Sequence, residues 1–216
     1  MKKIAVILAG CGRMDGSEIH ESVFTLLSIK QAGASYQCFS LNKDQEHVTN
    51  HLTNETVNEK RNMLIESARI ARGDIKELSS INIADFDALI IPGGNGTAYN
   101  LFTLATKGKD YTVDATVAQT CQDFTKAGKP VGYICIAPAM IPAIYDFPVQ
   151  MTIGTDQETA DLLESRGAIH HKHTVNEVCV DRKHKIISTP AYMLAENILE
   201  AYEGINKLVK KVVELS

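Results

Sequence analysis

Short, continuous apolar runs are the feature of this sequence that most constrains its fold. Ile4–Ala9, Asp87–Ile91 and the residues that follow Pro130 are each largely apolar over the length of one strand. Such runs are typical of strands covered on both faces, as in a parallel sheet. Between them, apolar residues recur at helical spacing, and several of these helical stretches stop at a glycine. Strands that alternate with helices over the whole chain predict an α/β fold with a doubly wound sheet.

The remaining elements are read in the same way. Asp15 and Glu18 have the spacing of a capping box before the first helix, which ends at Gly33. A polar stretch over residues 42–60 is interpreted as a surface insertion, with room for a small hairpin, in a single domain spanning residues 1–216. Further helices are predicted over 61–72, 113–126, 136–145 and 156–166, strands over 36–39 and 149–153, a hairpin over 177–188 near a sheet edge, and a long final helix capped by Thr189 and opened by Pro190.

Composition excludes several classes of protein. The formal net charge is -4 and no basic stripe follows any predicted helix, so nucleic acid is not an expected partner. The apolar run after Lys3 is too short for a secretory signal, and no later segment is expected to span a membrane. The five cysteines are odd in number and have no C-x-x-C spacing, which argues against disulfides and structural zinc. A reducing cytoplasm is the expected location.

Cys135 stands where an apolar strand stops and a helical run begins. A thiol at such a turn projects from the carboxyl edge of the sheet toward the positive end of the next helix, which favours the thiolate and lowers the pKa. A buried, inert cysteine among apolar neighbours is the alternative interpretation. The sequence therefore nominates Cys135 as a nucleophile whose activity depends on its surroundings.

The loops after three predicted strands converge with Cys135 on one expected cleft. Ligands of doubly wound sheets bind at the carboxyl ends of the strands. The glycines of Gly93–Gly96 free backbone N–H groups for an anion or oxyanion. Glu18 and Glu21 on the first helix could each reach this cleft, where a carboxyl group could exchange a proton with the thiol. His20 lies between them and is either a base or merely solvated. Complementing the helix dipole is the simpler role for both acids, and is favoured for Glu18.

No cofactor or metal is expected. The run Gly10–Gly12 fails the dinucleotide fingerprint because Asp15 stands at the position of the third glycine, and no phosphate-loop lysine is present. His171 and His173 alternate as two ligands on one strand would, but no cysteine or carboxylate lies near them at ligand spacing.

Motifs spread along the chain are shared with a known family. They are Ile7–Gly12 with Asp15–Glu21, Asn50–Thr53, Arg61–Ile70, Ile91–Gly94, Cys135–Met140, Thr152–Asp156 and Thr189–Ala195. Over essentially its full length the chain resembles the ElbB-like glyoxalases of the PfpI-like superfamily, which is related in fold to class I glutamine amidotransferases. The resemblance implies a flavodoxin-like sandwich with Cys135 as nucleophile. A glutamate a dozen residues before the glycine that closes the first helix is also implied, and this is Glu21.

The same resemblance implies a function. Relatives convert glyoxal to glycolate without glutathione or another cofactor, and they often pair, so a small dicarbonyl or aldehyde substrate and a homodimer are expected. In that scheme the Cys135 thiolate adds to the aldehyde, Glu21 moves the proton, and the Gly93–Gly94 turn and the N–H of Ile136 hold the oxyanion. Ile136 and Asp156 replace histidines of many relatives, which argues against a Cys–His dyad and amidase chemistry. A redox-responsive or partner-binding protein that uses oxidation of Cys135 is the alternative.

Overall fold

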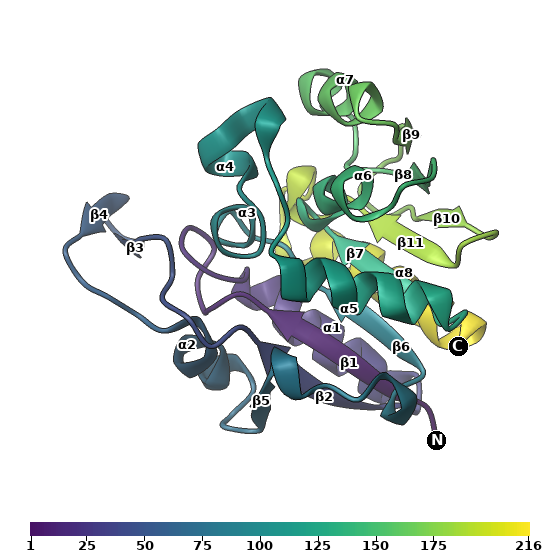
Figure 1. Cartoon of the computed structure of the whole chain (residues 1–216). Helices are drawn as coiled ribbons and strands as arrows, with labels where there is room; N and C mark the ends of the chain where they lie inside the picture. Colours follow the sequence, from purple (N-terminus) through teal and green to yellow (C-terminus); the bar gives the residue numbers. More distant parts are fainter.

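The computed structural model describes residues 1–216 and is built around a seven-stranded sheet in the order β10-β11-β7-β6-β1-β2-β5 (Figure 1). All neighbouring strands are parallel except β10 and β11, which form an antiparallel hairpin at one edge. The predicted doubly wound, mostly parallel sheet with a hairpin near its edge is therefore confirmed. The strands are β1 (Lys3–Leu8), β2 (Ser35–Ser40), β5 (Ile75–Glu77), β6 (Ala88–Ile91), β7 (Val131–Ile134), β10 (Cys179–Asp181) and β11 (Ile186–Thr189).

Helices cover both faces of this sheet because successive side chains of its strands point to opposite sides. Ile4, Val6 and Leu8 of β1 pack in one apolar cluster with residues of α1 (Ile19–Gln31) and α8 (Ile198–Leu215). The intervening Ala5 and Ile7 pack in a second cluster with residues of α5 (Ala115–Lys126) and α6 (Ile141–Ile144). Figure 1 shows α5 on one side of the sheet and α1 and α8 on the other. This two-sided burial explains why the strands are apolar throughout.

The other elements are short. They are the helices α2 (Met63–Ile70), α3 (Thr97–Asn100), α4 (Leu104–Lys107) and α7 (Gln157–Ser165), the 3₁₀ helices η1 (Leu78–Ser80), η2 (Ile83–Asp85), η3 (Gly108–Asp110), η4 (Ala137–Met140) and η5 (Ala191–Met193), and the strand pairs β3 (Val48–Asn50) with β4 (Glu55–Val57) and β8 (Gln150–Met151) with β9 (Ile169–His170). The helix predicted over 136–145 is thus two short helices, and the strand predicted over 149–153 lies outside the main sheet. No helix combines the length and the apolar character needed to cross a bilayer.

The prediction for the start of the final helix is wrong. Thr189 is the last residue of β11, and its hydroxyl donates to the Glu177 carbonyl instead of capping a helix. Pro190 leads into η5, and α8 begins only at Ile198, after Asn197 has capped it by accepting N–H hydrogen bonds. Pairing of Thr189 with Ile134 of β7 keeps the backbone extended and overrides the Thr-Pro signal.

The predicted capping box of the first helix is also wrong. Glu18 itself is the N-cap of α1, and its side chain accepts the Glu21 N–H at 2.7 Å. Asp15 is buried and accepts the Thr49 N–H at 2.8 Å, from the β3–β4 hairpin. Asp15 therefore joins the first loop to residues 42–60, which form this hairpin and pack on the loop.

Candidate active site

The cleft that contains Cys135 lies at the carboxyl edge of the sheet. The adjacent strands β11, β7, β6 and β1 all end there, and the loop after each contributes to the cleft wall. The sheet order reverses between β1 and β6, which is the place where doubly wound folds bind their ligands. The cleft has a volume of about 420 Å³ and is lined by Arg13, Glu18, His20, Gly94, Asn95, Cys135, Tyr192, Met193 and Ala195.

Cys135 follows directly after β7 and has a strained backbone. Its φ is +62°, a left-handed value that non-glycine residues adopt at a cost of about 1–2 kcal/mol. Its N–H donates to the Thr189 carbonyl at 2.9 Å, which ties the turn to the end of β11. Gly93 packs so closely that an added Cβ would lie 2.6 Å from the Cys135 Cβ. The turn thus holds Cys135 at the wall of the cleft, where only 7% of the residue is exposed to solvent.

Glu21 is the carboxyl group that meets this sulfur. It lies in the first turn of α1 and is fully buried, and it packs with Cys135 against Gly93, where an added Cβ would lie 3.0 Å from Glu21 Oε2 and 2.6 Å from the Cys135 Cβ. The Gly93 N–H donates to its Oε2 at 2.9 Å and the Tyr192 N–H donates to its Oε1 at 3.2 Å. Burial, and then the nearby Glu18 carboxylate, raise the pKa of Glu21 to about 8. A group with this pKa exchanges protons near neutral pH.

The pKa of Cys135 is raised, so the prediction that the turn lowers it is wrong. Burial raises it most, followed by the charge of Glu21, while the N–H groups of Gly94 and Ile136 donate to the sulfur and act in the opposite direction. The element after the turn is the four-residue 3₁₀ helix η4, too short to supply the dipole that was expected of a long helix. The thiol is therefore harder to ionise than a free cysteine, and the Glu21 carboxyl group lies beside it.

The structure brings the predicted site residues together and places Asp156, which stands where many relatives have a histidine, elsewhere. Cys135, Glu21, Gly93, Gly94 and Ile136 lie together, but the Gly93 N–H is occupied by Glu21, which leaves Gly94 and Ile136 as the N–H donors at the sulfur. Glu18 and His20 also line the cleft. Asp156, in contrast, caps α7 by accepting the Thr159 N–H at 2.9 Å.

The segment after β11, which supplies Tyr192, Met193 and Ala195, is the part of the cleft that the sequence reasoning missed. Tyr192 orients Glu21 through its backbone N–H, and its hydroxyl is hydrogen-bonded to His20 Nδ1 at 2.8 Å. The segment turns sharply at Ala191, whose φ is +42°. Tyr192 lies in the shared motif Thr189–Ala195, but the expectation of a helix there hid its place at the cleft. Arg13 lies in the glycine-punctuated first loop, which was expected to line the cleft, but no pattern singled it out within that loop.

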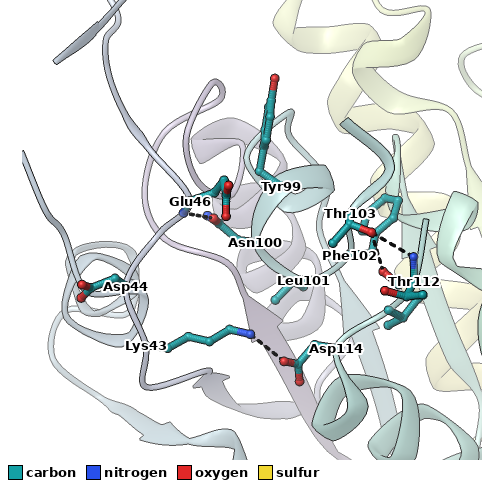
Figure 2. A pocket seen from close by; sticks show the side chains of 11 residues that line it. Lys43, Asp44, Glu46, Tyr99, Asn100, Leu101, Phe102, Thr103, Thr112 and Asp114 are labelled. Atoms are coloured by element: carbon teal, nitrogen blue, oxygen red, sulfur yellow. Dashed lines mark hydrogen bonds and ion pairs between the residues drawn. The ribbon is translucent and has the colours of Figure 1, made fainter. Parts of the chain in front are cut away.

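Another cavity, of about 300 Å³, lies between the segment before β3, the end of α3 with the residues that follow it, and the segment before α5 (Figure 2). Its lysine, Lys43, pairs with Asp114 at 2.6 Å, and the Asn100 side chain accepts the Glu46 N–H at 3.0 Å. These polar groups satisfy one another, and no cysteine or histidine lines the cavity. The cleft at Cys135 therefore remains the candidate active site.

Comparison with known proteins finds relatives that match the whole chain. The human mitochondrial glutamine amidotransferase-like class 1 domain-containing protein 3 is 40% identical over 224 residues, which cover 99% of this chain and 83% of that protein. A crystal structure of an isoprenoid biosynthesis protein with an amidotransferase-like domain from Ehrlichia chaffeensis is 35% identical, with a TM-score of 0.90 over 98% of this chain and 99% of that one. Glyoxalase III from Candida albicans shares the fold, with a TM-score of 0.64 and 13% identity over 99% and 97% of the two chains. No family model matches the sequence.

The names of the relatives contradict the predicted cytoplasmic location. The human protein and the rat and zebrafish ES1 proteins are all named as mitochondrial. The prediction depended on unpaired cysteines, and the structure has five free thiols. Free thiols argue against an oxidising compartment but do not distinguish one reducing compartment from another.

Proposed function

Because this chain belongs to the family of glutamine amidotransferase-like class 1 domain proteins that includes the ES1 proteins, we propose that its thiol–carboxyl pair is catalytic. The function that the site supports best is that of a cofactor-independent glyoxalase of the ElbB-like type, converting glyoxal and similar small dicarbonyls to hydroxy acids. The observation that carries the proposal is that Cys135, at its strained turn, and the buried Glu21 carboxyl group pack against the same residue, Gly93, whose N–H donates to Glu21 Oε2.

The first step is addition of sulfur to one aldehyde carbon. Ionised Glu21 takes the thiol proton as the S–C bond forms, so a free thiolate is not required beforehand. The carbonyl π electrons move to oxygen, and in this scheme the N–H groups of Gly94 and Ile136, which act on the resting sulfur, stabilise the oxyanion. Glu21 then returns the proton to that oxygen, which gives a neutral hemithioacetal.

The second stage is an internal redox change followed by hydrolysis. Glu21 removes the proton from the sulfur-bearing carbon and delivers it to the neighbouring carbon through an enediol, so one carbon is oxidised as the other is reduced. The product is the thioester of glycolate with Cys135. Water cleaves the S–C bond, the sulfur regains a proton, and glycolate leaves. Glyoxal plus water equals glycolic acid, so no external oxidant or reductant is needed.

The geometry favours this scheme over the redox-responsive alternative. Oxidation by peroxide requires thiolate character and exposure. The Cys135 sulfur is mostly buried and its pKa is raised, both of which slow oxidation. A neighbouring base activates such a thiol for a bound substrate without exposing a thiolate to oxidants.

The test is the production of glycolate from ¹³C-labelled glyoxal, followed by NMR. Cys135→Ser and Glu21→Gln are each expected to reduce kcat/KM at least about a hundredfold, since each removes one partner of the proton transfer. Cys11→Ser is the matched control, because Cys11 is a partly exposed thiol that does not line the cleft. Full activity in the Cys135 or Glu21 variant removes that residue from the scheme.

We also propose that the protein is a homodimer. Ile19, Val23 and Leu27 follow one another at four-residue spacing along α1, and they are 43%, 46% and 45% exposed. An exposed apolar stripe along one helix is an unusual feature of a monomer and is suited to self-association. A second copy of the same helix supports a symmetric contact of this kind.

A further inference from the structure

The cleft is larger than the substrate used to describe the reaction. Glyoxal has four non-hydrogen atoms, whereas the volume is about 420 Å³, within the range of about 300–1,000 Å³ that holds much larger ligands. A molecule that fills it extends from the sulfur toward the other lining residues. The chemistry of those residues therefore carries information about the remainder of the substrate.

Arg13 is the only lysine or arginine that lines this cleft. Its guanidinium group makes no side-chain hydrogen bond and no ion pair, although the acidic Glu18 lines the same space. Glu18 is already used as the cap of α1, where its Oε2 accepts the Glu21 N–H. The arginine is therefore left with its hydrogen-bond donors available to a ligand.

The backbone that carries Arg13 is fixed on both sides. The Gly96 N–H donates to the Arg13 carbonyl at 3.2 Å, which joins the first loop to the Gly93–Gly96 turn. The Gly16 N–H donates to the Gly12 carbonyl at 2.7 Å, and the Met14 N–H donates to His51 Nε2 at 3.2 Å. A charged side chain on a rigid loop can select a ligand at small entropic cost.

We infer that Arg13 is a specificity residue that binds an anionic group, and that the substrate is a 2-oxoaldehyde with a carboxylate or phosphate at its far end. A guanidinium group matches both anions through two parallel hydrogen bonds. The inference rests on the proposed function for the aldehyde end of the molecule. The anion end is tested separately by reagents that react with Cys135 and need no turnover.

The first experiment compares alkylation of Cys135 by iodoacetate and by iodoacetamide, which differ in charge and hardly in size. Peptide mass spectrometry gives the rate of Cys135 alkylation by iodoacetate divided by the rate by iodoacetamide, and this ratio is normalised to the same ratio for the thiol of glutathione. The normalised ratio is expected to fall at least about fivefold in Arg13→Gln and to be largely retained in Arg13→Lys. Arg182→Gln is the control for net charge, because Arg182 is an exposed residue in the turn between β10 and β11. A ratio that is the same in Arg13→Gln and the unmodified protein overturns the inference.

The second experiment identifies the anion. The carboxylate arm compares 4,5-dioxopentanoate with 2-oxopentanal, and the phosphate arm compares 3-phosphooxy-2-oxopropanal with 3-hydroxy-2-oxopropanal. The anionic member of at least one pair is expected to have the higher kcat/KM, and Arg13→Gln to abolish that preference. Equal kcat/KM within both pairs overturns the inference. If no dicarbonyl is turned over while the alkylation ratio responds to Arg13, the proposed function fails and anion recognition by Arg13 stands.

Discussion

Glu21 is the residue whose protonation controls the proposed chemistry. Its pKa is raised to about 8 by burial and then by Glu18, and the reaction needs its ionised form as the base. We therefore predict that kcat/KM for glyoxal rises with pH and levels off above about 8. Glu18→Gln keeps the oxygen that caps α1 but removes the charge, so it should move this rise to lower pH. A pH–rate profile of both proteins measures the shift, and coincident profiles would contradict it.

The same carboxyl group makes stability depend on pH. Between 4.5 and about 8 the folded chain holds a proton on Glu21 that the unfolded chain has released. The free energy of unfolding therefore falls as pH rises through this window, by about 1.4 kcal/mol for each pH unit from this group, and the dependence ends above it. We predict a shallower decline in Glu21→Gln. Urea unfolding at several pH values tests this, and equal slopes in the two proteins would argue against a buried, protonated carboxyl group.

At the scale of elements, the two glycine loops interlock at the site. A Cβ added to Gly96 would lie 1.8 Å from the Gly16 backbone nitrogen, whereas one added to Gly128 at the end of α5 would meet nothing within 4 Å. We predict that Gly96→Ala lowers the free energy of unfolding by more than about 3 kcal/mol. Gly128→Ala should cost only about 1 kcal/mol, from its positive φ. Denaturant unfolding compares them, and similar losses would show that the loops can separate freely.

At the scale of the whole molecule, the exposed stripe on α1 predicts the state of association. Sedimentation velocity should give twice the 23.7 kDa of the chain, and Val23→Glu should give the single-chain mass because it places a charge in the centre of the stripe. Leu52→Glu is the control, since Leu52 is 91% exposed in the β3–β4 hairpin. A monomeric unmodified protein, or a dimer that tolerates Val23→Glu, would rule out this surface.

The sequence alone was sufficient for features that depend on neighbours along the chain. The apolar run of Ile4–Ala9 identifies a strand buried on two sides, because both faces of a central strand exclude water. The abrupt change at Cys135 identified the turn for the same local reason, and the family resemblance favoured Glu21 over Glu18 as its partner. Thr189 shows the limit: its local signal predicted a helix cap, but pairing with β7 extended the chain past it.

Only the tertiary structure decided what surrounds the thiol. The order of the strands places the ends of β1, β6, β7 and β11 side by side, and this brings Arg13, Glu21 and Tyr192 to the same cleft as Cys135. It also buries the sulfur and the carboxyl group together, which raises both pKa values where the local pattern predicted a lowered one for the cysteine. Burial and charge are properties of residues distant in the sequence, so spacing along the chain does not determine them.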